Sequence, residues 1–111
     1  MILTYYRNFV ARLFVKRNEG VEGLLHAALG IAGEAGEIVD AVKKHWVYGK
    51  ALDRENLIEE IGDLLFYTQA LARLVDVDID GAIAANVAKL NKRYPAGYTD
   101  AAAIARADKA P

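Results

Sequence analysis

Cysteine is absent from the 111-residue sequence, so the chain can form neither a disulfide nor a thiolate metal site. Histidine is scarce, and neither His26 nor His45 falls three residues after a glutamate. This argues against zinc and against the Glu-x-x-His ligands of di-iron bundles. The net charge is only −1, so no basic excess points to a dedicated nucleic-acid partner. No stretch reaches the roughly 18 consecutive apolar residues of a membrane span.

The first residues also lack a targeting pattern. MILTYYRNFVARLF has no basic n-region, no apolar run and no small-residue cleavage site of a signal peptide. We therefore expect a soluble, cytoplasmic protein without a membrane partner. Hydrophobic residues make up 54% of the chain, which is enough for a core, and the length predicts a single domain over residues 1–111.

Helical periodicity dominates the sequence, and alternating strand-like runs are scarce. The pattern predicts four helices, over residues 3–16, from 21 or 24 to 44, 53–75, and from 78 or 80 to 93. Residues 18–23 are expected to form a turn and residues 46–52 a loop. The Ala-rich tail from about residue 99 is expected either to form a short helix on a partner subunit or to fray. These elements predict an all-α, four-helix bundle-like fold with antiparallel neighbours.

Side-chain patterns add detail to these helices. Asp53 is expected to cap the third helix, and Asp78 or Asp80 the fourth. The first helix carries an apolar stripe made of Tyr6, Phe9, Val10, Leu13 and Phe14. On the third helix, an apolar side made of Leu57, Ile61, Leu64, Leu65 and Thr68 adjoins a polar stripe of Asn56, Glu60, Asp63 and Tyr67.

Two short acidic motifs are the most informative feature of the chain. Glu34 and Glu37 lie three residues apart on the second predicted helix, and Glu60 and Asp63 are spaced equally on the third. Residues at i and i+3 share one face of a helix. No lysine or arginine occurs over residues 55–72, so the acids on the third helix have few basic partners. A pair of solvated helix faces is the alternative interpretation.

Four carboxylates on two packed helices repel each other strongly unless cations lie between them, so the motifs predict a divalent metal site. Hard oxygen ligands suit Mg²⁺, with Mn²⁺ as a substitute. The repeated glycines Gly30, Gly33 and Gly36 indicate a close approach to the helix backbone by another helix or by a ligand, because each glycine costs roughly 1 kcal/mol in a helix interior.

The order of these motifs resembles a known family. A Glu-x-x-Glu motif is followed by residues 38–59 and then by a Glu-x-x-Asp motif. This order resembles the signature of the MazG-like all-α nucleotide pyrophosphohydrolases, and the chain looks closest to their small phage-type members. The surrounding segments GIAGEAGEIVDAVKKHWVYGK, LIEEIGDLLFY and NVAKLNKRYP fit as well. The resemblance extends over residues 26–99.

The resemblance implies hydrolysis of a (deoxy)nucleoside triphosphate to the monophosphate and pyrophosphate. It also implies that Glu34, Glu37, Glu60 and Asp63 bind Mg²⁺, and that the protein is a homodimer or a dimer of dimers. We expect water to attack the α-phosphorus, with Glu37 and Glu60 as the catalytic carboxylates and Glu37 as the one that orients or deprotonates the water. The alternatives are a related hydrolase acting on another phosphoanhydride, or a non-catalytic helical dimerisation or regulatory module.

Substrate-binding residues are predicted outside the acidic motifs. Asn86, Lys89 and Arg93 share one face of the fourth helix, where the two basic side chains could contact phosphate oxygens; an exposed polar face is the alternative. Trp46 could stack on a base, although a core or dimer contact would explain it as well. Tyr67, one turn beyond Asp63, could contact the sugar or base, or pack in the core.

Overall fold

The computed structural model describes residues 2–14 and 20–109 and places them in helices, turns and loops, together with one isolated bridge between Pro95 and Gly97. The helices are α1 (Ile2–Leu13), α2 (Gly20–Tyr48), α3 (Arg54–Leu74), α4 (Ile79–Arg93), α5 (Asp100–Ala105) and the short 3₁₀ helix η2 (Ala107–Lys109). The prediction of an all-α fold is confirmed. The described residues divide into two compact units, one before and one after the boundary between Val77 and Asp78.

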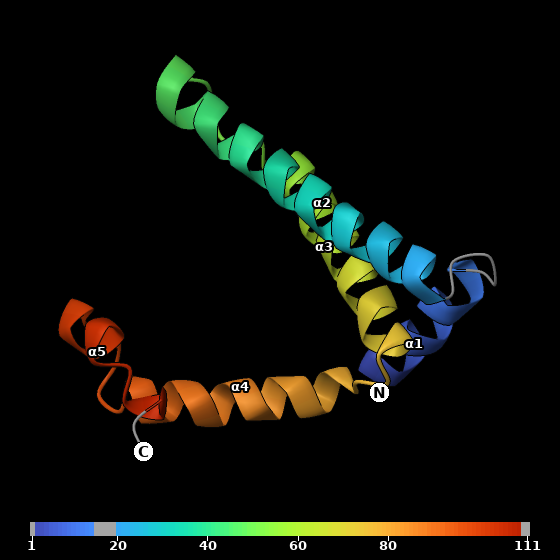
Figure 1. Ribbon diagram of the computed structural model, residues 1–111. Coiled ribbons are helices and arrows are strands. Elements are labelled where there is room, and N and C mark those ends of the chain that lie inside the picture. Colours follow the sequence, from blue (N-terminus) through green and yellow to red (C-terminus); the bar gives the residue numbers. More distant parts are fainter. Residues whose placement is uncertain (1, 15–19, 110–111) are drawn as a thin grey trace. The chain divides into compact units, whose positions relative to one another are not determined.

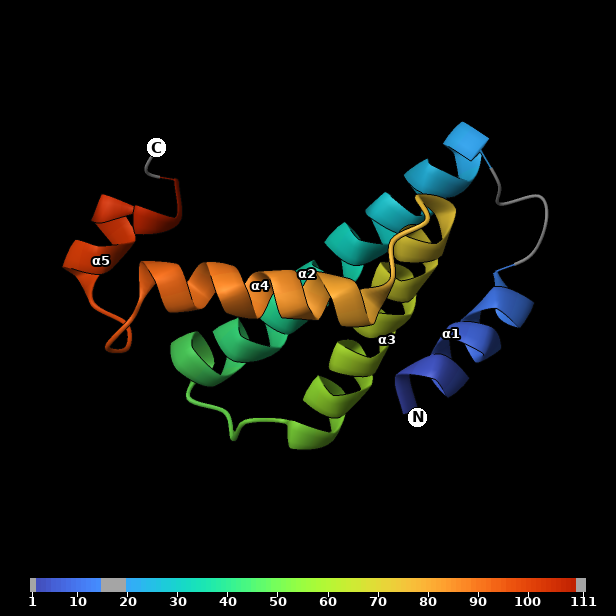
Figure 2. The same cartoon turned by 90° about the horizontal axis from the view of Figure 1, so that it is seen from below.

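The first unit is built on an antiparallel pair of long helices. α2 and α3 run side by side and make the most extensive contact between helices, and α1 packs against α3 (Figures 1 and 2). Asp53 caps α3 as predicted, because its Oδ1 accepts a hydrogen bond from the Asn56 backbone N–H at 3.1 Å. The predicted third helix is therefore found with its predicted cap.

The core of this unit is small and lies near α1. Val10, Phe14, Ala27 and Ala70 are buried together, and Tyr6, Phe66, Tyr67, Leu71 and Leu74 pack around them. Of the five residues in the predicted stripe of α1, only those at four-residue spacing face inward, namely Tyr6, Val10 and Phe14. Phe9 and Leu13 are exposed, because a single contact with α3 covers a narrower arc of the helix than the stripe spans.

The predicted close approach to a glycine occurs at Gly30. A Cβ atom there would overlap the ring of Tyr67, whereas Cβ atoms at Gly33 and Gly36 would meet nothing within 4 Å. The Tyr67 ring also lies 5.9 Å from the His26 ring, centroid to centroid. Gly30 is therefore the position that lets α3 approach α2 through an aromatic side chain.

Burial on α3 does not follow the division into an apolar and a polar side. Glu60, in the polar stripe, is buried, while Ile61 and Leu65, on the apolar side, are about half exposed. Within the described residues of one chain, α3 therefore turns part of its polar stripe inward, and part of its apolar side stays open to solvent.

Several helix boundaries differ from the predicted ones. α1 ends at Leu13, and the predicted residues 15 and 16 lie outside the described part of the chain, as do residues 18 and 19 of the predicted turn. α2 begins at Gly20 and continues to Tyr48, so the prediction that Trp46 lies in a loop was wrong. The run KKHWVY contains no proline or glycine, so nothing stops the helix before Gly49, whose φ is +65°.

The second unit contains α4, α5 and η2. Asp78 caps α4, with its Oδ1 accepting from the Asp80 N–H at 3.2 Å, and so settles the choice between the two predicted caps. Part of the tail forms the short helix α5, which contacts α4 of the same chain; the predicted docking of this helix on a partner subunit stays a prediction. No helix within residues 2–14 and 20–109 is long and apolar enough to cross a membrane.

Candidate functional site

Three acidic side chains converge between α2 and α3. Glu34 on α2 and Glu60 and Asp63 on α3 each offer a carboxylate oxygen, and these oxygens lie within 4.8 Å of one another. Glu60 is 9% exposed, Glu34 is half-buried and Asp63 is exposed, so the cluster opens from the helix interface toward solvent. The i, i+3 spacing of Glu60 and Asp63 places both on one side of α3, where α2 brings Glu34 to meet them.

The Glu60 carboxyl is the group in the cluster whose ionisation is most affected by burial and by the neighbouring acids. Its Oε2 is buried and accepts no hydrogen bond among the described residues. A hydrogen bond with Glu34, burial, and the charges of Glu34, Glu37 and Asp63 together raise the pKa of Glu60 to about 7. Without a cation, the cluster therefore favours a proton on Glu60 near neutral pH.

This donor set fits a hard cation. All three side chains supply oxygen, one oxygen of Glu60 is buried without a partner, and the three carboxylates lie close together. A divalent ion would meet the unpartnered oxygen and remove the repulsion that raises the pKa of Glu60. The acidic cluster could therefore hold a metal ion.

Glu37 is placed apart from the three clustered acids. It is exposed on α2 and does not join the group of mutually close oxygens. Its charge nevertheless contributes to the raised pKa of Glu60, so it lies within electrostatic reach of the cluster. The structure thus brings together three of the four predicted metal ligands and leaves Glu37 at the margin.

Tyr6 borders the cluster from α1, and the sequence analysis did not single it out for the site. Partial burial and the charge of Asp63 raise the pKa of the Tyr6 hydroxyl. Tyr6 and Asp63 are 57 residues apart in the chain, and no local pattern could have related them.

Two predicted substrate contacts lie elsewhere on the first unit. Tyr67 packs against Gly30, His26 and the core. Of the two alternatives predicted for Tyr67, this is packing in the core. Trp46 is 82% exposed near the end of α2, so within the described residues it forms no core contact.

The remaining predicted residues belong to α4, in the second unit. Asn86 and Lys89 are exposed. Arg93 is half-buried and forms a bidentate ion pair with Asp108 of η2, with 2.9 Å between Nη2 and Oδ2. The guanidinium of Arg93 is therefore already engaged by a carboxylate.

Comparison with known proteins identifies the family. The model of the MazG nucleotide pyrophosphohydrolase domain matches residues 23–98, a range that contains most of α2, all of α3 and α4, and all four motif acids. The chain is also similar to the Gene 37 protein of Mycobacterium phage L5, with 34% identity over 83 residues that cover 71% of this chain and 73% of the phage protein. No solved structure matches. The chain belongs to the MazG nucleotide pyrophosphohydrolase family.

Proposed function

We propose that the protein hydrolyses a (deoxy)nucleoside triphosphate to the monophosphate and pyrophosphate in a Mg²⁺-dependent reaction. The observation that carries this proposal is the cluster of Glu34, Glu60 and Asp63 with a buried, unpartnered oxygen of Glu60. Family membership supports the reaction class. A nucleotide substrate also agrees with the cytoplasmic location predicted from the sequence.

Glu34, Glu60 and Asp63 would hold the cation, with Glu37 as a fourth acid at its margin. A bound Mg²⁺, which Mn²⁺ could replace, would neutralise phosphate oxygens and lower the pKa of a water molecule. Carboxylates in a helix pair are suited to this task because rigid helices fix their positions before the substrate arrives.

Glu37 is the side chain best placed to act on the attacking water. It is exposed and stands outside the close group of acids, so its carboxylate is free to accept a proton. The water oxygen forms a bond to the α-phosphorus, the bond from that phosphorus to the bridging oxygen breaks, and pyrophosphate leaves with the electron pair. Glu60, the other predicted catalytic residue, would position the reacting groups.

Phosphate and base contacts are proposed for the residues outside the acidic cluster. Lys89 and Asn86 are exposed and have the donor groups that phosphate oxygens require. Arg93 would join them only after leaving Asp108. Trp46 offers an exposed aromatic face for stacking on a base, and Tyr67 would bound the site from its core position.

We also propose that the active form is a homodimer or a dimer of dimers. One chain buries few large side chains, and Val10 is the largest fully buried residue described. Exposed apolar side chains lie on both long helices of the first unit, at Leu25, Leu29, Val39, Ile58, Ile61 and Leu65. A second copy packed on these helices would bury their exposed apolar side chains in a bundle of helices from both chains.

Product analysis tests the proposed reaction. The purified chain is incubated with Mg²⁺ and each common or damaged dNTP, and pyrophosphate and orthophosphate are measured separately. Monophosphate with pyrophosphate is expected from at least one substrate. Orthophosphate alone would place the attack at a terminal phosphate and contradict the mechanism.

Variants of the acids give the matching control. Glu37→Gln and Glu60→Gln are expected to abolish turnover, because each removes a carboxylate while keeping the side-chain shape. Circular dichroism should show unchanged helix content. Full activity in either variant would refute the role assigned to that residue.

A further inference from the structure

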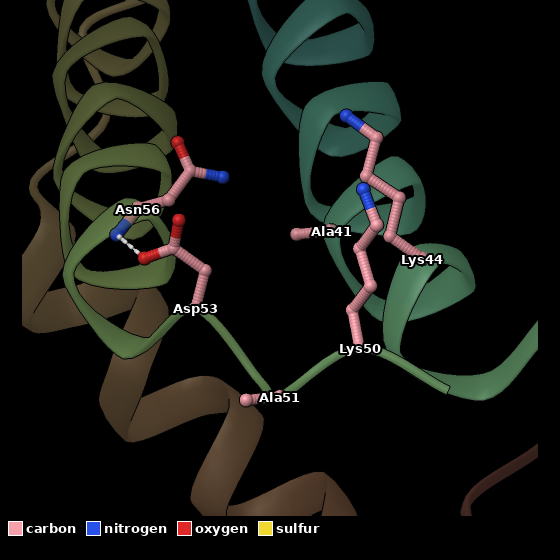
Figure 3. Close-up of a pocket in the computed structure, with 6 residues that line it drawn as sticks. All are labelled: Ala41, Lys44, Lys50, Ala51, Asp53 and Asn56. Carbon is pink, nitrogen blue, oxygen red and sulfur yellow. Dashed lines mark hydrogen bonds between the residues drawn. The ribbon is translucent and has the colours of Figure 1, made fainter. Parts of the chain in front are cut away.

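A basic cavity lies at the connected end of the α2–α3 pair. It has a volume of about 240 Å³ and is lined by Ala41, Lys44, Lys50, Ala51, Asp53 and Asn56. Lys44 and Lys50 extend from the α2 side and face Asp53 and Asn56 on the α3 side (Figure 3). This cavity is distinct from the acidic cluster, and none of the motif acids lines it.

The cavity continues the line of the acidic motifs along both helices. Ala41 follows Glu37 by four residues on α2, and Asn56 precedes Glu60 by four residues on α3. Residues four apart lie on the same face of a helix, about 6 Å apart along its axis. On α3 the basic cavity therefore lies about one turn from Glu60. On α2 it lies about one turn from Glu37, at the margin of the cluster, and about two turns from Glu34.

The charges in the cavity favour an anion. Within the described residues, no acidic side chain pairs with the ammonium of Lys50. Lys44 lies 2.8 Å from Asp40, and both side chains are about half exposed, so this pair is weak enough to exchange partners. The Asp53 carboxylate is held by the N-terminus of α3 through the Asn56 N–H, where the helix dipole offsets its charge.

The loop that carries Lys50 is held in place. His45 Nδ1 lies 2.7 Å from the Lys50 carbonyl oxygen, and this contact ties the loop to the last turns of α2. The backbone of Lys50 is thereby held beside the last turns of α2, and its side chain lines the cavity together with that of Lys44.

We propose that this cavity binds the terminal phosphates of the nucleotide, and afterwards the leaving pyrophosphate, with Lys44 and Lys50 as positioning residues that contact phosphate oxygens. The assignment rests on the proposed function, because it sets the α-phosphate beside the acidic cluster and the rest of the phosphate chain one helical turn away. Lysine is suited to this role as a point charge for phosphate. The subsite is separate from the phosphate contacts proposed for α4.

Pyrophosphate affinity is the direct test. Lys44→Gln, Lys50→Gln and the double variant are titrated with inorganic pyrophosphate and Mg²⁺ in a calorimeter, beside the unaltered protein. Loss of charge-assisted hydrogen bonds is expected to weaken pyrophosphate binding by about tenfold or more in the double variant. Lys43→Gln is the matched control, because Lys43 is a neighbouring α2 lysine that lies over the Tyr48 ring and does not line the cavity.

The outcomes separate the subsite from the reaction. Unchanged pyrophosphate affinity in the double variant, or an equal loss in Lys43→Gln, would overturn the subsite even if nucleotides are hydrolysed. Lysine-dependent pyrophosphate binding without hydrolysis of any nucleotide would support the subsite while refuting the proposed function. If the chain both hydrolyses a nucleotide and binds pyrophosphate through the two lysines, the double variant should show a higher KM for the nucleotide and a higher inhibition constant for pyrophosphate. Its helix content should be unchanged.

Discussion

Glu60 combines burial with clustered negative charge, and this combination makes the metal-free protein sensitive to pH. Its pKa of about 7 in the folded chain exceeds the ordinary value of 4.5. A carboxyl whose pKa is raised by folding binds its proton more tightly in the native state. Its favourable contribution is therefore complete below the unfolded pKa and is lost as the pH rises through the folded pKa.

In the presence of a chelator, we predict that thermal stability falls between about pH 4.5 and about pH 7, the two pKa values of Glu60. Adding Mg²⁺ at pH 7 should raise the melting temperature, because the cation binds the native carboxylates. Glu60→Gln should flatten the pH dependence and remove most of the Mg²⁺ effect. A Mg²⁺ shift of full size in Glu60→Gln would place the cation elsewhere.

Gly30 gives a prediction that concerns packing alone. Gly30→Ala would force a methyl group into the Tyr67 ring and should destabilise the protein by about 1–3 kcal/mol, as overpacking does. Gly33→Ala is the control, because its Cβ meets nothing within 4 Å and should stabilise the helix by up to about 1 kcal/mol. Urea denaturation measures both, and equal effects would show that α2 and α3 can separate freely at Gly30.

At the scale of the helices, the sequence predicted helix ends best where the capping signal lies within a few residues. Asp53 and Asp78 lie at the N-termini of α3 and α4 because their side chains accept backbone N–H groups only two or three residues away. The proximity of Glu60 and Asp63 on α3 was also predictable, because i, i+3 spacing places two residues on one face of a helix. The predicted loop over residues 46–52 contains Gly49, but the helix continues up to that glycine, because residues 46–48 contain no helix breaker.

Long-range features could not be predicted in this way. The periodicity of α3 identifies an apolar and a polar side, but it does not say which one meets α2 and which stays exposed in one chain. The approach of Tyr6 to Asp63 and the pairing of Arg93 with Asp108 depend on tertiary packing, which leaves no trace in spacing. The separation of Glu37 from the other three acids has the same origin.

The contact between α4 and η2 should be sensitive to acid. Arg93 lowers the pKa of the Asp108 carboxyl below its ordinary value of 3.8. A carboxyl with a lowered pKa adds stability above the unfolded pKa and loses it as the pH falls through the folded pKa. We therefore predict that α5 and η2 detach from α4 below about pH 3.8, as measured by amide hydrogen exchange over residues 100–109.

Asp108→Asn tests this assignment at neutral pH. The neutral amide cannot replace the bidentate carboxylate, so protection of the tail amides, relative to their intrinsic exchange rates, should already be low at pH 7 and should change little on acidification. A tail that stays protected in the variant would show that apolar contacts, and not the ion pair, hold it on α4.

For the chain as a whole, the exposed apolar side chains predict self-association. Leu29 is 62% exposed on α2, and we expect Leu29→Glu to shift the protein toward monomer in light scattering, because a charge cannot be buried unpaired in an interface. Ile104→Glu, at an even more exposed apolar position on α5, should leave the assembly intact. An unchanged mass for Leu29→Glu would exclude α2 from the interface.

The unpartnered oxygen of Glu60 also has a consequence for the degradation of the chain by proteases. A newly made molecule without a cation carries like charges across its main helix contact, and the opened states that proteases attack are then more populated. Capturing a cation suppresses those states by mass action. The ion that would serve catalysis would therefore also protect the chain from degradation. Scarcity of the ion would then lower both the amount of protein and the rate of the proposed reaction.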